Sequence, residues 1–439
     1  MASTISVLDL PPEITSVIFL HCVLDECGPV RRSEEYGPER RFPTLSEELA
    51  PLLLGRICRR WRSIAWSTPE LWTMVEVDCP LCIDDVVPHL ERWLLRAGSL
   101  PLTLDIHYDA LSHTSSDALL RLLQRHSARF QDLTLNITPP DDLFRNEMVG
   151  ALPALKKFDL IGATIQYSGG LQDWDGTITA FKVAPKLRDV CFMNLSPSKI
   201  DLPWGQLTTF RAESITVAEC LLVLSLAPGL VTCRFDSFHD ASGPAAVPPL
   251  LHLKSLILQS EFNYSTDVLK HLTTPTLVHL DAGELELDIW SAFLTRSQCV
   301  LDRLAFTDDP AMYRPVTYRQ YFDALPSLSE LKVRQVGQSF YELFRLLKAC
   351  PLFLPNLKSF TDGVDLYRPW HKNGAELAQL VIEMLEARRR GAADNTRLEK
   401  FDLHETRGFV GSSRLAERLR VLVDGGMKIH IEGSESWGR

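Results

Sequence analysis

Residues 227–236 read APGLVTCRFD, and a closely related segment, TPTLVHLDA, follows at 274–282. In both segments a leucine comes two residues after a proline. An apolar residue follows three positions after the leucine, and a second apolar residue follows two positions after the first. Proline ends a preceding helix and favours an extended backbone, so each segment is expected to form a short strand whose two apolar side chains face one way. The two segments therefore predict a repeated strand.

Copies of this pattern recur through the chain at leucine-rich-repeat spacing. Between residues 187 and 357, successive first leucines are 20 to 29 residues apart, and the last step is 41 residues. A period of 20–29 residues is typical of leucine-rich repeats, in which each unit buries its leucines only against its neighbours. The first leucines are Leu155, Leu187, Leu207, Leu230, Leu253, Leu277, Leu301, Leu328, Leu357 and Leu398, and Phe130 begins an earlier copy.

The segments between these strands have helical periodicity, for example TVAECLLVLSLA (216–227) and ELAQLVIEMLEARRR (376–390). Less regular strands are expected at 74–78 and 102–106. The fold class is therefore α/β: residues 78–439 form an irregular leucine-rich-repeat-like solenoid, with parallel strands on the concave face and helices outside. The asparagine ladder of strict repeats is missing, so the repeats are degenerate.

Composition excludes several classes of protein. The 439 residues carry 46 Lys+Arg against 56 Asp+Glu, a net charge of −10 that argues against general nucleic-acid binding. We recognise no secretory signal, and apolar runs such as CLLVLSLA (220–227) are too short to cross a bilayer. A cytoplasmic or nuclear location is expected, in which the ten scattered cysteines are thiols.

The N-terminal 77 residues have a different organisation, with short helices and many large apolar side chains. Pro11 or Pro12 suits a first helical turn, and Ile14, Val17 and Ile18 follow at helical spacing. Residues 25–44 are charged and rich in Gly and Pro, which predicts an inserted loop. Further helices are expected within 45–72, with Gly55 separating two of them and with Ile57, Trp61, Ile64 and Ala65 on one stripe.

Three blocks in this segment, LPPEI (10–14), ICRRWRSIA (57–65) and TPELW (68–72), resemble an F-box, in particular the F-box-like sequences of mushroom-forming fungi. The resemblance covers about residues 8–77. It implies docking on a Skp-type adaptor and, through it, on a cullin-containing ubiquitin ligase. The residues that it implies for contacting the adaptor, or for shaping the surface that does, are Leu10, Pro11, Glu13, Ile14, Trp61, Leu71 and Trp72. The alternative is that these are core residues of a small helical cap.

Strand residues that alternate with the buried apolar positions are expected on the concave surface. Their mixed charges suit selective recognition of a protein, although an ordinary solvated face has the same pattern. The candidate target-binding residues are Asp159, Arg211, Glu213, Arg234, Asp236, Asp281, Lys332, Arg334, Asp402 and His404. The target itself is not identified by the sequence.

No catalytic motif, cofactor or metal site is predicted. Phosphate-binding, zinc-protease and nucleophile-elbow patterns do not occur. Cys79 and Cys82 form a lone C-x-x-C that could bind zinc only together with Cys22 and Cys27, about 50 residues away. The sequence thus favours a non-catalytic subunit that recruits substrates to a ubiquitin ligase. The alternatives are a non-degradative scaffold that engages no cullin, and an enzyme with an unrecognised site.

Overall fold

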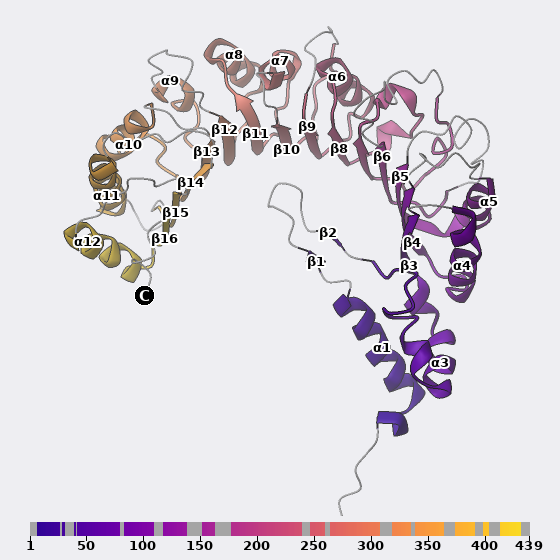
Figure 1. The fold of residues 1–439 in the computed structure, drawn as a ribbon. Coiled ribbons are helices and arrows are strands. Elements are labelled where there is room, and N and C mark those ends of the chain that lie inside the picture. Colours follow the sequence, from indigo (N-terminus) through magenta and orange to yellow (C-terminus); the bar gives the residue numbers. More distant parts are fainter. Residues whose placement is uncertain are drawn as a thin grey trace, which may run out of the picture. The chain divides into compact units, whose positions relative to one another are not determined.

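The structure is a computed structural model that describes residues 7–26, 29–30, 39–40, 42–79, 83–108, 117–137, 152–162, 177–238, 246–259, 264–307, 318–334, 339–363, 374–390, 398–403 and 413–431. The chain divides into two compact units, Met1–Glu213 (unit 1) and Ser214–Arg439 (unit 2). N-terminal helices precede fourteen parallel strands that alternate with helices (Figure 1). The predicted α/β class is confirmed, with an open parallel sheet as in leucine-rich-repeat solenoids.

Unit 1 starts with a helical module and continues with six parallel strands. Its helices are α1 (Pro12–Glu26), α2 (Leu54–Ile57), α3 (Arg59–Trp66), α4 (Ile83–Arg96) and α5 (Asp117–His126), with 3₁₀ helices at Val7–Asp9, Pro69–Trp72 (η2), Ser127–Arg129 (η3), Pro197–Lys199 and Trp204–Gln206. Its parallel strands are β3 (Met74–Cys79), β4 (Leu102–Tyr108), β5 (Phe130–Ile137), β6 (Lys157–Gly162), β7 (Asp189–Met193) and β8 (Thr209–Glu213). The two less regular strands expected near 74 and 102 are confirmed.

Within the predicted 25–44 loop, β1 (Pro29–Val30) and β2 (Glu39–Arg40) pair in antiparallel fashion. Residues 27–28, 31–38 and 41 lie outside the described part of the chain. The predicted domain boundary near residue 77 stays a prediction, since the compact unit that contains the helical module extends to Glu213.

Unit 2 contains eight parallel strands and seven helices among its described residues. The strands are β9 (Thr232–Asp236), β10 (Ser255–Gln259), β11 (His279–Glu284), β12 (Arg303–Thr307), β13 (Glu330–Arg334), β14 (Ser359–Gly363), β15 (Lys400–Leu403) and β16 (Lys428–Ile431). The helices are α6 (Val217–Leu226), α7 (Tyr264–His271), α8 (Leu287–Ser297), α9 (Tyr318–Phe322), α10 (Ser339–Ala349), α11 (Gly374–Arg390) and α12 (Ser413–Asp424). None of the described helices is long and apolar enough to cross a membrane.

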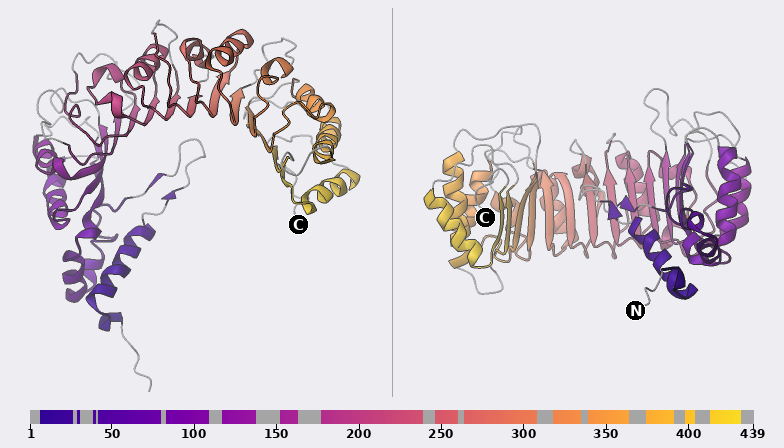
Figure 2. Two further views of the ribbon diagram at one scale, coloured as in Figure 1. Left: turned by 180° about the vertical axis from the view of Figure 1, so that it is seen from behind. Right: turned by 60° about the horizontal axis from the view of Figure 1, so that its bottom comes forward.

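Side-chain burial alternates along the strands, as the sequence pattern requires. In β7 and β8, for example, every second side chain is buried and those between are partly exposed. The repeated leucines, such as Leu253, Leu277 and Leu301, have no exposed surface. Helices cover the face of the strands that holds these apolar side chains (Figure 2). The opposite face, which carries the partly exposed side chains of each strand, is called the open face below.

A backbone ladder links successive repeats of unit 2 just before each strand begins. The carbonyl of Lys254 accepts hydrogen bonds from the N–H groups of both Val278 and His279, at 2.9 Å each. The same two-to-one arrangement continues at the carbonyls of Val278, Asp302, Ser329 and Lys358. Because these bonds use only main-chain atoms, the repeats stack in register without the asparagine ladder of strict leucine-rich repeats.

Arginine side chains tie neighbouring helices together. A helix leaves its last carbonyl groups without partners in the helix, and a cation at that end is also favoured by the helix dipole. Arg388 on α11 donates hydrogen bonds to the carbonyls of Leu347 and Leu354, at and beyond the C-terminal end of α10. Arg296 on α8 does the same for α7, and Arg129 in η3 for α4. In these three places an arginine supplies donors to carbonyl groups at the end of a preceding helix.

Candidate functional site

The helical module is held together by one side of α1. Phe19 and Val23 are buried where α1 packs against α3 and η2, and the rings of Phe19 and Trp61 meet edge to face at 5.0 Å. Arg60 on α3 donates a 2.7 Å hydrogen bond to the carbonyl of Leu10, just before α1 begins. These contacts fix the orientation of α1 within unit 1.

The other side of α1 is also apolar but is exposed. Ile14, Val17, Ile18 and Leu24 expose 51%, 49%, 38% and 54% of their surface. At 100° per residue they share one helix face, opposite to that of Phe19 and Val23. A helix that is apolar on both faces is normally covered on both, so this stripe is an unmatched apolar surface among the described residues of the module.

The predicted adaptor residues fall into two groups. Leu10 and Trp61 are half-buried, while Pro11, Glu13 and Ile14 are exposed beside or on the α1 stripe. Leu71 and Trp72 are instead buried, with 1% and 0% of their surface exposed. The indole N–H of Trp72 donates to the carbonyl of Ala65 at 2.9 Å, and its ring meets Trp93 on α4 edge to face. Their place in the core makes them residues that shape the module, since a docked partner could not touch them directly.

The expected stripe of Ile57, Trp61, Ile64 and Ala65 on a single helix is wrong. The helix breaks at Cys58, whose backbone is extended and whose Sγ accepts a hydrogen bond from the N–H of Trp61 at 3.4 Å. Gly55, the expected separator, lies inside α2. Because Cys58 starts a new helix, Ile57 points elsewhere and exposes 53% of its surface, while Ile64 and Ala65 are buried. Ile57 thus adds to the exposed apolar surface of the module.

A cation–π stack joins the module to α4. The guanidinium of Arg96 on α4 lies between two tryptophans, 4.8 Å from the ring centroid of Trp66 and 4.6 Å from that of Trp72. Burial, together with the positive charge of Arg92, lowers the pKa of Arg96 without removing its charge at neutral pH. The stack holds the module on the first repeat of unit 1, while the α1 stripe stays exposed among the described residues.

In unit 1, three of the predicted target-binding residues lie on the open face. Asp159 on β6 forms an ion pair with Lys157 at 2.7 Å, and Arg211 on β8 forms one with Asp189 on β7 at 3.5 Å. Glu213 is two residues beyond Arg211 on the same face, and is partly exposed. The charges therefore face the predicted side of the sheet, but two of them are already engaged with partners that the sequence pattern did not identify.

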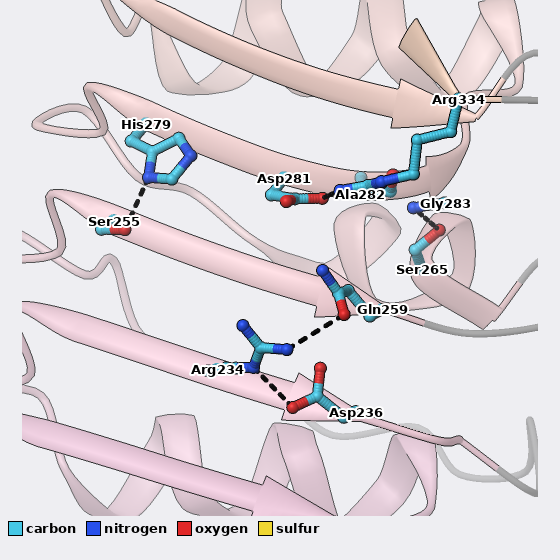
Figure 3. A network of polar contacts seen from close by, with 10 residues as sticks. All are labelled: Arg234, Asp236, Ser255, Gln259, Ser265, His279, Asp281, Ala282, Gly283 and Arg334. Carbon is cyan, nitrogen blue, oxygen red and sulfur yellow. Dashed lines mark hydrogen bonds and ion pairs between the residues drawn. The ribbon is translucent and has the colours of Figure 1, made fainter. Parts of the chain in front are cut away.

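The polar side chains of unit 2 form preassembled networks on the open face (Figure 3). Arg234 donates to Asp236 at 2.6 Å and to Gln259 on the next strand at 3.0 Å, and the two charged side chains are only 16% and 12% exposed. Ion pairs this well sheltered fix side-chain positions more than exposed pairs do.

A second ion pair joins two strands that have another strand between them. Arg334 on β13 donates to Asp281 on β11 and, at 3.3 Å, to the carbonyl of Ala282. The strand between them, β12, places Ala305 beside Asp281 on the open face, where its small side chain is buried. Only a small residue leaves room for a guanidinium to pass above it. A bulge in β11 just beyond Asp281 is held by a 3.1 Å hydrogen bond from the N–H of Gly283 to Ser265.

The remaining predicted target-binding residues are Lys332, Asp402 and His404. Lys332 on β13 is half-buried. Asp402 on β15 is buried and pairs with Lys400 at 2.6 Å. His404 lies outside the described residues.

Burial suppresses the reactivity of the thiol of Cys191. Cys191 lies between Asp159 and Arg211 on the open face, and burial raises the pKa of its thiol to about 12, with Asp159 adding to the rise. A thiol with such a pKa stays protonated and is a poor nucleophile near neutral pH. No group of three or more His, Cys, Asp or Glu residues able to hold a metal ion occurs among the described residues. Cys27 and Cys82, needed for the alternative zinc site, lie outside them.

No protein-family model matches the sequence, and a search of curated proteins finds no significant match. The resemblance of the N-terminal module to an F-box therefore rests on its three blocks of residues. The fold is that of a leucine-rich-repeat-like α/β protein, with no family identified.

Proposed function

We propose that the chain is the substrate-recognition subunit of a Skp–cullin–F-box ubiquitin ligase. In this proposal α1 docks on a Skp-type adaptor and the repeats bind a target protein. The chain performs no bond chemistry itself; it raises the effective concentration of the target near the ligase. The observation that carries the proposal is the exposed apolar stripe of α1, on a module whose sequence resembles an F-box.

Two features of the module support docking through α1. The stripe of Ile14, Val17, Ile18 and Leu24 lies on a helix whose opposite side is anchored by Phe19, so a partner meets a preoriented surface. Glu13 lies at the exposed N-terminal end of the same helix, two residues after the exposed Pro11, and can form part of the polar rim that such interfaces need. Leu71 and Trp72 contribute indirectly, by holding the module in shape.

Binding of the full chain to a purified Skp-type adaptor tests the proposal. The double variant Ile14→Asp, Ile18→Asp places two charges in the stripe without touching the buried side of α1. We expect it to weaken adaptor binding at least about tenfold, because charges at the centre of an apolar interface are desolvated without a partner. The matched control is Val300→Asp, Leu352→Asp, which alters two exposed apolar residues of unit 2 and should leave adaptor binding unchanged.

The alternative of a non-degradative scaffold is separated in the same experiment by adding a cullin. If the chain is a ligase subunit, the adaptor-bound complex recruits the cullin. Capture of the adaptor without the cullin would favour the scaffold. Equal adaptor binding by wild type and the α1 double variant, with both folded, would reject α1 as the docking surface.

A further inference from the structure

Arg96 on α4 is a partly exposed cation that has no acceptor within the described part of the chain. Its guanidinium lies between the rings of Trp66 and Trp72, which fix its position. It forms no hydrogen bond and no ion pair with the described residues. A guanidinium has five N–H donors and a permanent charge, so Arg96 presents donors that are held in place but lack an acceptor in the chain.

Two further arginines lie beside Arg96. Arg62 on α3 is 5.5 Å from the ring centroid of Trp66, so two guanidiniums lie against the same indole. Arg92 is exposed one turn before Arg96 on α4, and its positive charge adds to the effect of burial in lowering the pKa of Arg96. The two cations of α4 therefore repel each other. Arg62, Arg92, Arg96 and Trp66 are called the arginine site below.

The hydrogen bonds of Arg62 and Arg92 reach only neutral acceptors. Arg62 donates from Nε to the carbonyl of Gly55 at 2.7 Å. Arg92 donates to the carbonyl of Pro88 at 3.2 Å and to the ring of His89 at 3.3 Å. These bonds orient the two side chains without neutralising them, and neither arginine forms an ion pair with a carboxylate among the described residues.

Carboxylates are scarce on the two helices that carry the arginine site. Helix α3 contains none, and Glu91 is the only carboxylate among the described side chains of α4. Glu91 is itself engaged in an ion pair with Arg125 on α5. Like charges that gather without a counter-charge repel one another, so an anion from outside the chain would be stabilised at the arginine site.

Exposed apolar side chains adjoin these charges. The indole of Trp66 is 46% exposed even though two guanidiniums lie against it, and Leu95, next to Arg96 on α4, is 64% exposed. Tryptophan and arginine are the residues most often found to dominate binding at protein interfaces. The combination fits a ligand that has both carboxylates and an apolar side chain, which a small inorganic anion does not provide.

We propose that the arginine site binds an acidic segment of a partner protein, with aspartate or glutamate on the arginines and an apolar side chain against Trp66 and Leu95. Charge complementarity selects this partner, and a guanidinium can bind a carboxylate through two parallel hydrogen bonds. The site uses none of the residues of the α1 stripe or of the open face. The inference therefore goes beyond the proposed function and does not rest on it.

Direct binding of a synthetic probe to the full chain tests the inference. The probe is a fluorescent peptide of about nine residues in which glutamates flank a central leucine, and the control peptide has glutamine in place of glutamate. The net charge of −10 repels an acidic peptide, so binding would report a local site rather than the charge of the whole chain. We expect only the glutamate peptide to bind, at least about tenfold more weakly in about 0.5 M NaCl than in about 0.05 M. Equal binding of the two peptides, or none of either, would overturn the inference.

Two double variants with the same change of charge locate the site. Arg62→Gln, Arg92→Gln removes two cations of the arginine site and leaves Arg96 in place. Arg303→Gln, Arg345→Gln removes two exposed arginines of unit 2. We expect the first variant to weaken binding of the glutamate peptide about tenfold and the second less than about twofold. Equal weakening by the two variants would show that the arginine site is not the place of binding.

A measurement on the wild type does not depend on any variant folding. In a chain labelled with nitrogen-15 at arginine, the Nε–H signals of Arg62, Arg92 and Arg96 should shift when the glutamate peptide is added. Shifts mainly at arginines within Ser214–Arg439 would overturn the inference.

Vesicles of phosphatidylserine test a membrane surface as the other possible occupant. Sedimentation of the wild type with these vesicles, but not of the Arg62→Gln, Arg92→Gln variant, together with no binding of the peptide, would replace the acidic protein segment by an anionic membrane and reject the inference.

Discussion

The two compact units share one strand–helix repeat but differ in how completely their surfaces are matched. In unit 2, sheltered ion pairs join charges on the open face, as in Arg234–Asp236 and Arg334–Asp281. In unit 1 the α1 stripe is exposed, and the strand residues of the open face that the structure describes include seven carboxylates and two permanent cations, Lys157 and Arg211. Unmatched apolar surface costs stability without a partner, which is consistent with the proposed docking of a partner on α1.

Helices α1 and α6 show the same difference locally. Both are apolar around most of their circumference. In α6, Val217, Leu221 and Leu224 are buried and only Leu226 is substantially exposed, because the sheet and the neighbouring helix α7 cover it. Helix α1 has described neighbours on one side only. Helices of similar composition therefore differ in exposure, and the number of neighbours decides whether an apolar face is buried or stays exposed.

The largest expected effect is the difference in stability between a variant with a charge placed in α6 and one with a charge placed in α1. Leu224→Asp removes a fully buried leucine from α6 and buries a carboxylate, so the free energy of unfolding should fall by about 4 kcal/mol or more. Ile18→Asp on the exposed stripe of α1 should change it by less than about 0.5 kcal/mol. Urea unfolding followed by circular dichroism measures both.

The contrast between the exposed helix α1 and the buried helix α6 would be wrong if Ile18→Asp destabilised the chain as strongly as Leu224→Asp. That result would mean that α1 is covered by another part of the same chain in solution. The control is Ser16→Asp, a partly exposed polar position on α1, which should be nearly neutral.

A smaller effect is expected from the arginines that bond to carbonyl groups. Arg388→Met leaves the carbonyls at the end of α10 without donors in a buried site, which should lower the free energy of unfolding by about 2 kcal/mol. Burial lowers the pKa of Arg388 to about 10, so part of its interaction energy already offsets desolvation. Arg60→Met in the helical module removes an exposed hydrogen bond to Leu10 and should cost less than about 0.5 kcal/mol.

The same urea titration measures this pair of variants. Arg60→Met could lower the free energy of unfolding as much as Arg388→Met does. The helical module would then depend on arginine–carbonyl hydrogen bonds as strongly as the repeats do, and the two units would not differ in this respect. A cost near zero for Arg388→Met would show that water reaches the orphaned carbonyls in the variant.

The repeat was predictable because each copy carries its own local signal. Leu230 and Leu277 begin segments whose proline, spacing and alternation are all short-range features, and strands formed at both. Strand β16 was missed because it lacks the leading proline and leucine and has only the short alternation KIHI. The break at Cys58 was missed because Ile57 and Trp61 fit helical spacing, and nothing local reports the extended backbone between them.

The faces of the candidate sites were also predictable, but their pairing was not. Alternation along a strand places Arg334 on the open face, whereas its partner Asp281 lies 53 residues earlier and two strands away. That contact depends on the register of three strands and on the size of Ala305. In the same way, the blocks that resemble an F-box identify Trp72 and Ile14 together, but only three-dimensional packing separates the buried tryptophan from the exposed isoleucine.

The smallest expected effect compares one histidine from each open face. The pKa of His107 in unit 1 is raised, first by its hydrogen bond to Asp105. Its protonation therefore stabilises the fold below the unfolded pKa of about 6.5, and this gain is lost as the pH rises through the folded value. In unit 2 the pKa of His279 is lowered, first by burial. Protonation there favours the unfolded chain, so stability is lost as the pH falls.

The two histidines should thus respond to acid with opposite signs. From about pH 8.5 to about pH 5.5, the cost of His107→Gln should grow, while His279→Gln should become more favourable relative to wild type. NMR titration of the ring protons of the wild type measures the same contrast directly, with His107 titrating above about 6.5 and His279 below it. If His107 titrated below about 6.5, the carboxylates around it would not act on the ring in solution, and the charge contrast between the two open faces would lose its support.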